Sequence, residues 1–270
     1  MSVATYVYAV RRCGGAEVHV PGHPGGSPVR LLPFGALVAV VQDVPAEDFT
    51  EEAMRRRLAD PAELERCART HHAIVTACAD TAPTVPLPLA TLYANDVRAR
   101  AALEEHEERF GAALHRLAGH VEWAVKVHRD GASPGPGIAP GPAPAAEPAE
   151  DPGASGDGRS YLRQVRERQR QRDRHHEQSL DVADLVDRTV RSLAVAAVRR
   201  RPHGVEVTGR DRPQVMNAAY LLAREDHVRL SSLISTLEAD PRLRGYAVET
   251  SGPWVPYSFA NDEDPHGETV

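Results

Sequence analysis

Cys67 and His71 are the two residues whose types and spacing best suit metal chemistry. A Cys and a His four residues apart on a helix share one face, and together they can supply two zinc ligands. A structural zinc site needs four ligands, and no third or fourth stands near this pair in the sequence. We therefore interpret His71 as a core histidine that is hydrogen bonded to a backbone carbonyl, and we predict no metal site.

The other groups of titratable residues indicate solvated helix faces rather than a catalytic site. His175 and His176 are neighbours, so their side chains diverge by about 100° on a helix. The glutamates at 104, 105, 107 and 108 surround a helix face with no apolar pocket beside it. No nucleophile is paired with a base and an orienting group, and neither a phosphate-binding glycine motif nor HExxH occurs. The sequence therefore predicts a non-enzymatic protein without a cofactor.

An arginine-rich segment, Arg159–Arg201, is the main candidate for binding a charged partner. It holds twelve Arg residues against six Asp and Glu residues. Acidic residues are scattered through it and Tyr161 is its one aromatic residue, which is typical of a solvated helix with ion pairs between successive turns. A protein interface is the next alternative, and a phosphate-binding face for nucleic acid comes last.

Three aromatic residues cluster near the end of the chain, at Trp254, Tyr257 and Phe259. Pro253 and Pro256 stiffen this stretch, because each fixes its own φ and holds the preceding residue extended. Three large rings on a stiff backbone must pack against the protein's own core, another domain or a partner. We expect them to pack against the first domain, with Trp254 buried, and contact with a partner is the alternative.

The length and composition of the chain favour one large domain or two ordinary ones, with a core built from Ala, Val and Leu. The 270 residues are 41% hydrophobic but only 5% aromatic, and the net charge is −6. This charge does not require nucleic acid or an anionic membrane as a partner. An odd number of cysteines without CxxC spacing, and the lack of an apolar run near ~20 residues, predict a soluble, cytoplasmic protein.

Hydrophobic periodicity predicts strands and helices in both halves of the chain. In the first half we expect strands at 5–10, 29–32, 36–41 and 121–127, an irregular extended segment at 85–93, and helices that begin near Asp48, Asp60 and Asp96. In the second half we expect a helix from Ser160 to about Val198 with Arg199 to Arg201 at its C-terminus, strands at 205–208 and 245–250, and a helix at 226–238. Residues 214–223 suit a buried strand or a helix.

A segment rich in Pro, Gly and Ala, Gly131–Gly158, separates the two halves. It has seven residues of each of these types, and its one branched aliphatic residue is Ile138. It cannot bury enough apolar surface to offset an ordering cost of ~1–2 kcal/mol per residue. We therefore predict an α+β protein with two domains, 1–130 and 159–270, joined by a disordered linker at 131–158. Each domain is expected to be a helix-backed antiparallel or mixed sheet.

Seven segments, taken in order, resemble motifs of the GvpL/GvpF family of gas vesicle accessory proteins. They are the strands at 6–9 and 37–41, the helix segment His71–Val75, the strand Gly119–Val127, the segment Gly158–Leu162, the segment Asn217–Leu221, and the tail Gly252–Phe259. A departure occurs at Leu89-Ala90-Thr91, where the family has Phe-Gly-Thr.

The resemblance implies a ferredoxin-like first domain and a non-catalytic role in gas vesicle assembly. It implies binding of the small hydrophobic shell protein, to help nucleation or prevent aggregation, and association with the vesicle and with other accessory proteins. The alternative is a nucleic-acid-associated regulator that uses the helix at 159–201. The candidates for structural or partner contacts are Trp123, Tyr161, Trp254, Tyr257 and Phe259. We expect no membrane partner.

Overall fold

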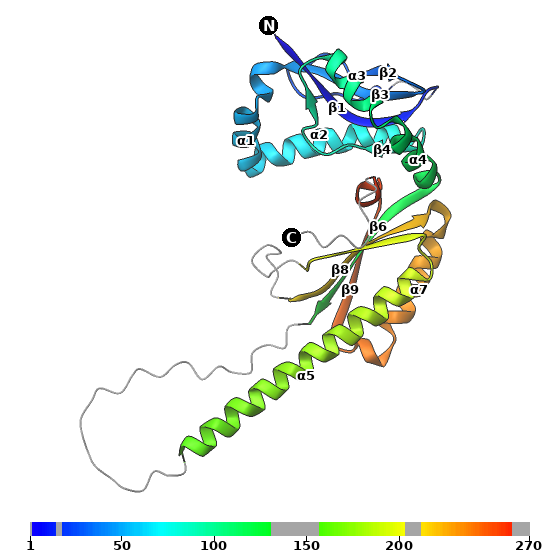
Figure 1. The fold of residues 1–270 in the computed structure, drawn as a ribbon. Helices are drawn as coiled ribbons and strands as arrows, with labels where there is room; N and C mark the ends of the chain where they lie inside the picture. The colour runs from blue at the N-terminus through cyan, green and yellow to red at the C-terminus, as the bar shows by residue number, and fades with distance from the viewer. Residues whose placement is uncertain (1, 15–17, 131–156, 203–211, 261–270) are drawn as a thin grey trace, which may run out of the picture.

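The computed structural model describes residues 2–14, 18–130, 157–202 and 212–260, which form two antiparallel sheets backed by helices (Figure 1). This confirms the predicted α+β class. The predicted linker lies outside the described residues except at its last two positions, and the predicted strand at 205–208 lies outside them entirely.

The first sheet is built around a long central strand, β1. Its strands are β1 (Val3–Arg12), β2 (Arg30–Phe34), β3 (Leu37–Pro45), β4 (Thr84–Pro86) and β5 (Leu92–Tyr93). The order is β2-β3-β1-β4, with β5 also paired to β1, and every pairing is antiparallel. Side chains alternate along β1, so Tyr6 and Tyr8 enter one core cluster while Val7 enters another.

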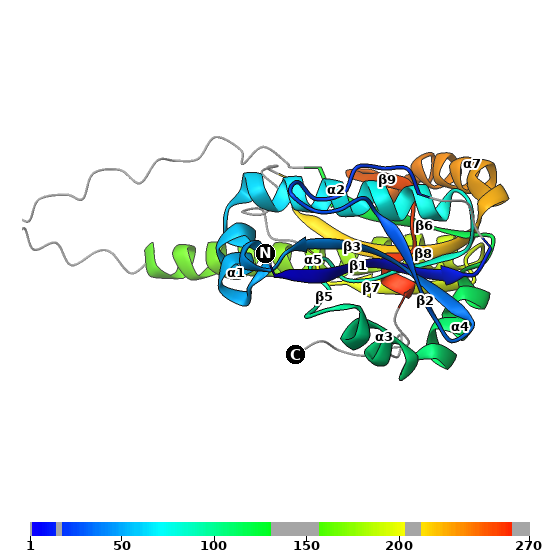
Figure 2. The same cartoon turned by 90° about the horizontal axis from the view of Figure 1, so that it is seen from above.

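Helices cover this sheet on both sides (Figure 2). They are α1 (Glu51–Ala59), α2 (Pro61–Ala79), α3 (Asp96–Glu104) and α4 (Glu107–Leu117). The predicted cap residue Asp60 accepts a hydrogen bond from the Ala62 N–H at 2.9 Å, with Pro61 at the first helical position. The buried stripe of α2 packs Ile74, Val75 and Cys78 against the tyrosines of β1.

The second sheet has the order β7-β8-β6-β9 and is also antiparallel. Its elements are β6 (His120–Arg129), α5 (Asp157–Arg191), β7 (Ala196–Arg200), β8 (Gln214–Ala223), α7 (His227–Glu238) and β9 (Tyr246–Trp254). This succession, strand-helix-strand-strand-helix-strand, is the ferredoxin-like order. The structure therefore differs from the expectation in one detail: that order lies in the second sheet, whereas no helix lies between β1 and β2 in the described part of the first.

Two other boundaries differ from those expected. The strand at 120–129 pairs with β8 and β9, so it belongs to the second sheet although it precedes residue 130. The helix expected to reach Val198 ends at Arg191, and Arg199 and Arg200 lie in β7 rather than at a helix C-terminus. The apolar run 193–198 fits either a helix stripe or a short strand, and pairing with β8 decides for the strand. Residues 214–223, which suited either form, are a strand.

One core cluster joins the two halves. Along β8, Ala219 and Leu221 enter the cluster that also contains Leu114 of α4 and Val7 of β1. The other face of β8, including Tyr220, packs against α5 and α7. The two sheets are therefore connected by buried apolar contacts as well as by the chain.

Replacing Ala90 with glycine is expected to raise the free energy of unfolding by about 0.5 kcal/mol. The φ of Ala90 is +66°, a left-handed conformation that costs an L-residue about 1–2 kcal/mol. Glycine removes this cost but gains freedom in the unfolded chain, which offsets about 0.4–1 kcal/mol. Urea unfolding measures the change, and Ala73→Gly within α2 is the control, expected to lower stability by about 1 kcal/mol. A less stable Ala90→Gly protein would contradict this account.

Candidate functional site

The stretch that follows β9 lies between the two halves, as the red segment of Figure 1 shows. We call residues 252–260, which are the last three residues of β9 and the six that follow it, the tail. It begins within β9, at Gly252, whose φ is +149°. A Cβ on Gly252 would lie 2.9 Å from the carbonyl oxygen of Glu122 and 2.9 Å from the Trp123 ring. Only glycine lets the tail approach β6 this closely.

A buried carboxylate holds the far end of the tail. Glu122 of β6 is nearly buried, with 7% of its side chain exposed. Its carboxylate accepts hydrogen bonds from the Ser258 N–H, at 2.8 Å, and from the Ser258 hydroxyl. The guanidinium of Arg200, on β7, lies 3.4 Å from the same carboxylate and also donates to the Ser258 hydroxyl. A buried charge is tolerated only with such partners, so Glu122 fixes the tail to the second sheet.

The tail also contacts the first half of the chain. Phe259 is buried in the cluster that joins the halves, and its carbonyl accepts a hydrogen bond from Arg116 of α4 at 3.0 Å. Val255 is buried with the side chains of α2 and β1. The Tyr257 ring lies 6.3 Å from that of His71 and 6.1 Å from that of His72, measured between centroids. The tail thus contacts both sheets.

Trp254 is the exception, because 45% of it is exposed. The expectation that Trp254 is buried is therefore wrong. Its ring lies 5.8 Å from that of His72, at the rim of a groove of about 500 Å³ between the two halves. The groove is lined by α2 and the loop after it, the start of β6, and the tail, including His72, Thr76, Asp80, Leu117, His120 and Trp254. A large apolar ring at the edge of a hollow suits contact with a partner.

Comparisons with known proteins agree on one family. A family model described as "Gas vesicle synthesis protein GvpL/GvpF" matches residues 4–261. The chain belongs to the GvpL/GvpF family. It is 38% identical over 264 residues to gas vesicle protein L of Streptomyces sp. (strain CB03234), covering 97% of this chain and 95% of that protein. It is 25% identical over 242 residues to gas vesicle protein L1 of Halobacterium salinarum, covering 87% and 82%.

The fold is shared with GvpF proteins of known structure. The crystal structure of the gas vesicle protein GvpF from Anabaena sp. PCC7120 superposes with a TM-score of 0.66 at 15% identity, covering 99% of this chain and all of that one. GvpF from Microcystis aeruginosa gives 0.61 at 14% identity, covering 96% and 99%. The chain is therefore a GvpL/GvpF-type gas vesicle accessory protein with the fold of these structures.

The five candidate residues of this GvpL/GvpF protein do not form one site. Trp254, Tyr257 and Phe259 lie together on the tail. Trp123 points to the opposite face of the second sheet and packs against the cluster beneath α5 and α7. Tyr161 lies in α5, and its side chain is outside the described part of the chain.

Glu122 and His72 are functional candidates that sequence reasoning missed. A signal for Glu122 was present, since it is the one acidic residue in the otherwise apolar and basic strand 120–129. Such a residue in a strand that is buried on both faces needs a partner. The partner, Ser258, lies 136 positions away, so no local pattern could reveal it.

His71 lies in a buried polar cluster rather than in a metal site. Its Nε2–H donates to the Leu87 carbonyl at 3.1 Å, as predicted, and its Nδ1 accepts from the Tyr6 hydroxyl at 3.0 Å. Burial lowers the pKa of His71 to about 4, so the imidazole is neutral at pH 7. Among the described residues, no three His, Cys, Asp or Glu side chains are grouped as a metal ion would require.

The described part of the chain also contains no helix that is both long and apolar enough to cross a membrane.

Proposed function

We infer that this protein is a non-catalytic accessory protein of gas vesicle assembly that binds the small hydrophobic shell protein at the groove beside Trp254. The observation that carries the proposal is the exposed Trp254 ring at the rim of a hollow shared by both halves. Membership of the GvpL/GvpF family supports the choice of partner. In this role the protein acts in the cytoplasm, associated with gas vesicles and with other accessory proteins.

The physical need for such a protein comes from the shell subunit. A small hydrophobic subunit that is not yet assembled exposes apolar faces and strand edges, and these aggregate unless they are covered. The groove is lined by the indole ring of Trp254, by the apolar side chains of Leu117, Val121 and Val255, and by the polar side chains of His72 and Asp80. Such a mixture of apolar and polar groups is found in protein interfaces.

Replacing Trp254 with alanine is expected to weaken shell-protein binding about tenfold or more while leaving thermal stability nearly unchanged. A partly exposed aromatic residue at a groove contributes to binding as a hot spot, where loss of 1.4 kcal/mol or more is common. The measurement is capture of this protein by tagged shell protein, together with a thermal melt of each variant. Val97→Ala on α3 is the matched control, because Val97 is exposed but lies outside the groove.

Two results would count against the proposal, and they are distinguishable. If the folded wild-type protein fails to bind folded shell protein at low salt and high concentration, the shell protein is not its direct partner. If wild type and Trp254→Ala bind equally well, the partner is right but the groove is the wrong surface.

A further inference from the structure

The first half of α5 extends away from the folded body, as both views show (Figures 1 and 2). The helix has 35 residues and is therefore about 52 Å long. Every side chain from Arg163 to Gln178 is exposed, and packing begins only at Ser179. We call residues 163–178 the arm. A helical segment of this length without tertiary packing is only marginally stable in water.

The charges of α5 are separated along its length. The arm carries six Arg residues, at 163, 166, 168, 170, 172 and 174, against three acidic residues, at 167, 173 and 177. From Glu177, in the last turn of the arm, the charged residues are acidic, at 177, 181, 184 and 187, and no basic residue occurs until Arg188; we call residues 177–187 the acidic part. This order opposes the helix dipole, which favours acidic residues near the N-terminus and basic residues near the C-terminus. The arrangement therefore weakens the isolated helix.

The basic and acidic parts share one face of α5. Steps of three or four residues connect Arg163, Arg166, Arg170 and Arg174 and continue through Glu177, Asp181 and Asp184. This face lies opposite the residues that α5 buries against the sheet, such as Val182, Val186 and Val190. Within the arm, Arg174 pairs with Glu167 at 2.9 Å.

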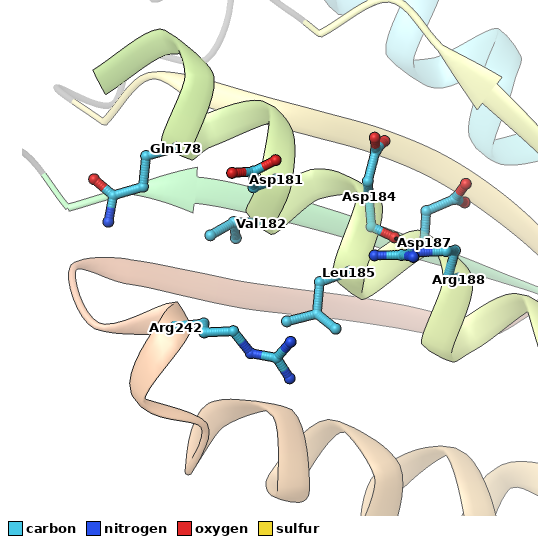
Figure 3. Close-up of a pocket in the computed structure, with 8 residues that line it drawn as sticks. All are labelled: Gln178, Asp181, Val182, Asp184, Leu185, Asp187, Arg188 and Arg242. Carbon is cyan, nitrogen blue, oxygen red and sulfur yellow. Dashed lines mark hydrogen bonds between the residues drawn. The ribbon is translucent and has the colours of Figure 1, made fainter. Parts of the chain in front are cut away.

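Beside the acidic part lies a groove of about 650 Å³, shown in Figure 3. Its walls come from α5, including Asp181, Leu185 and Arg188, and from Arg242 in the short 3₁₀ helix Pro241–Leu243. Figure 3 shows Arg242 extending toward Leu185. Leu185 also lines an apolar groove between α5 and α7, together with Val228, Leu233 and Leu237. A second helix lying along α5 would therefore meet carboxylates flanked by apolar surface.

We propose that two copies of this chain pair through antiparallel α5 helices, with the arm of each copy lying along the acidic part of the other. An antiparallel arrangement places Arg170 across from Asp181 and Arg174 across from Glu177, whereas a parallel one places arginine beside arginine. The contact is symmetric, since each copy supplies one arm and one acidic surface. It also gives each arm a surface to pack on, which the described residues of a single chain do not provide.

A second copy fits these observations better than nucleic acid. A phosphate backbone would be attracted to the arm but repelled by the carboxylates that continue the same face. A second α5 matches both charges at once. This inference does not depend on the shell protein being the partner at Trp254.

Charge reversal with rescue tests the pairing in the full-length chain. One variant carries Arg170→Glu and Arg174→Glu, and the other carries Glu177→Arg and Asp181→Arg; all four side chains are exposed. Sedimentation should show a wild-type dimer at about 50 mM salt whose dissociation constant rises at about 500 mM. Each variant alone should dimerise at least tenfold more weakly. An equimolar mixture of the two should regain the dimer, because every arm then meets a surface of opposite charge.

Circular dichroism of each variant shows whether the helix remains formed. A wild type that is monomeric at low salt and high concentration would overturn the proposal, as would variants that dimerise like wild type or a mixture that stays monomeric. Salt-sensitive binding of nucleic acid by monomeric wild type, lost in Arg170→Glu, Arg174→Glu, would overturn it in favour of a phosphate-binding arm.

Discussion

Replacing Phe259 with alanine is expected to lower the free energy of unfolding by about 3–5 kcal/mol, the range for a buried aromatic residue. Phe259 is 6% exposed and lies in the cluster that contains residues of both sheets. Its removal leaves a cavity at the junction of the halves. Urea unfolding followed by circular dichroism gives the change, and for a chain of this size the melting temperature should fall by roughly 10 °C.

Trp254→Ala is the matched comparison for this prediction. Both residues are large aromatics on the tail, but 45% of Trp254 is exposed, so its loss should cost about 1 kcal/mol or less. Equal losses from the two substitutions would mean that the tail does not pack as the structure shows. A small effect of Phe259→Ala alone would mean that the halves are held together elsewhere.

Stability is expected to fall as the pH is lowered from about 6.5 to about 4. Burial lowers the pKa values of His23 and His71 to about 4 in the folded protein, whereas in the unfolded chain a histidine titrates near 6.5. Between these values the unfolded chain binds more protons than the folded one, so acid favours unfolding. The contribution of these two histidines to the free energy of unfolding is fully present above pH 6.5 and is lost as the pH falls toward 4. Each histidine accounts for about 3 kcal/mol at most.

The two contributions are less than additive, because the charge of His71 is one of the causes that lower the pKa of His23. Protonation of the Asp96 carboxylate affects stability in a separate range of pH. Hydrogen bonding to Arg30 lowers the pKa of Asp96 below the usual value of 3.8. The stability that this carboxylate contributes is therefore lost only at a pH more acidic than the range in which the histidines act.

Unfolding free energies measured from pH 7.5 to 4 test this prediction. His71→Leu should flatten the slope between pH 6.5 and 4, although it loses two buried hydrogen bonds and is less stable at neutral pH. The control is Ile74→Val in the same cluster, which should lower stability by about 0.5–1.5 kcal/mol at every pH without changing the slope. Parallel curves for wild type and His71→Leu would contradict the assignment.

Local patterns were sufficient for most elements but not for their pairing. The alternation in Val121–Val127 correctly predicted β6, and the cap at Asp60 correctly predicted the start of α2. Neither pattern shows which strands lie beside β6. The partners of β6 lie near residues 220 and 250, so its place in the second sheet follows from contacts that sequence periodicity does not encode.

The candidate site was predictable only in part, for a related reason. Composition and prolines identified the tail as a packed segment, but not which ring is buried. That choice depends on the register of β9 against β6, which turns Trp254 toward solvent and leads Phe259 into the core. Glu122, which fixes this geometry, was hidden because its partner Ser258 is remote in sequence.

The position of the tail in the chain determines when the two halves can be joined during synthesis. The strands and helices of residues 3–117 can form their sheet as soon as they leave the ribosome, because all their pairings lie within that span. The second sheet waits for β9, and Val255 and Phe259 emerge later still. Until then β6 has one unpaired edge and the core between the halves lacks its last side chains. A nascent chain stalled before residue 246 should therefore expose a sheet edge that chaperones bind.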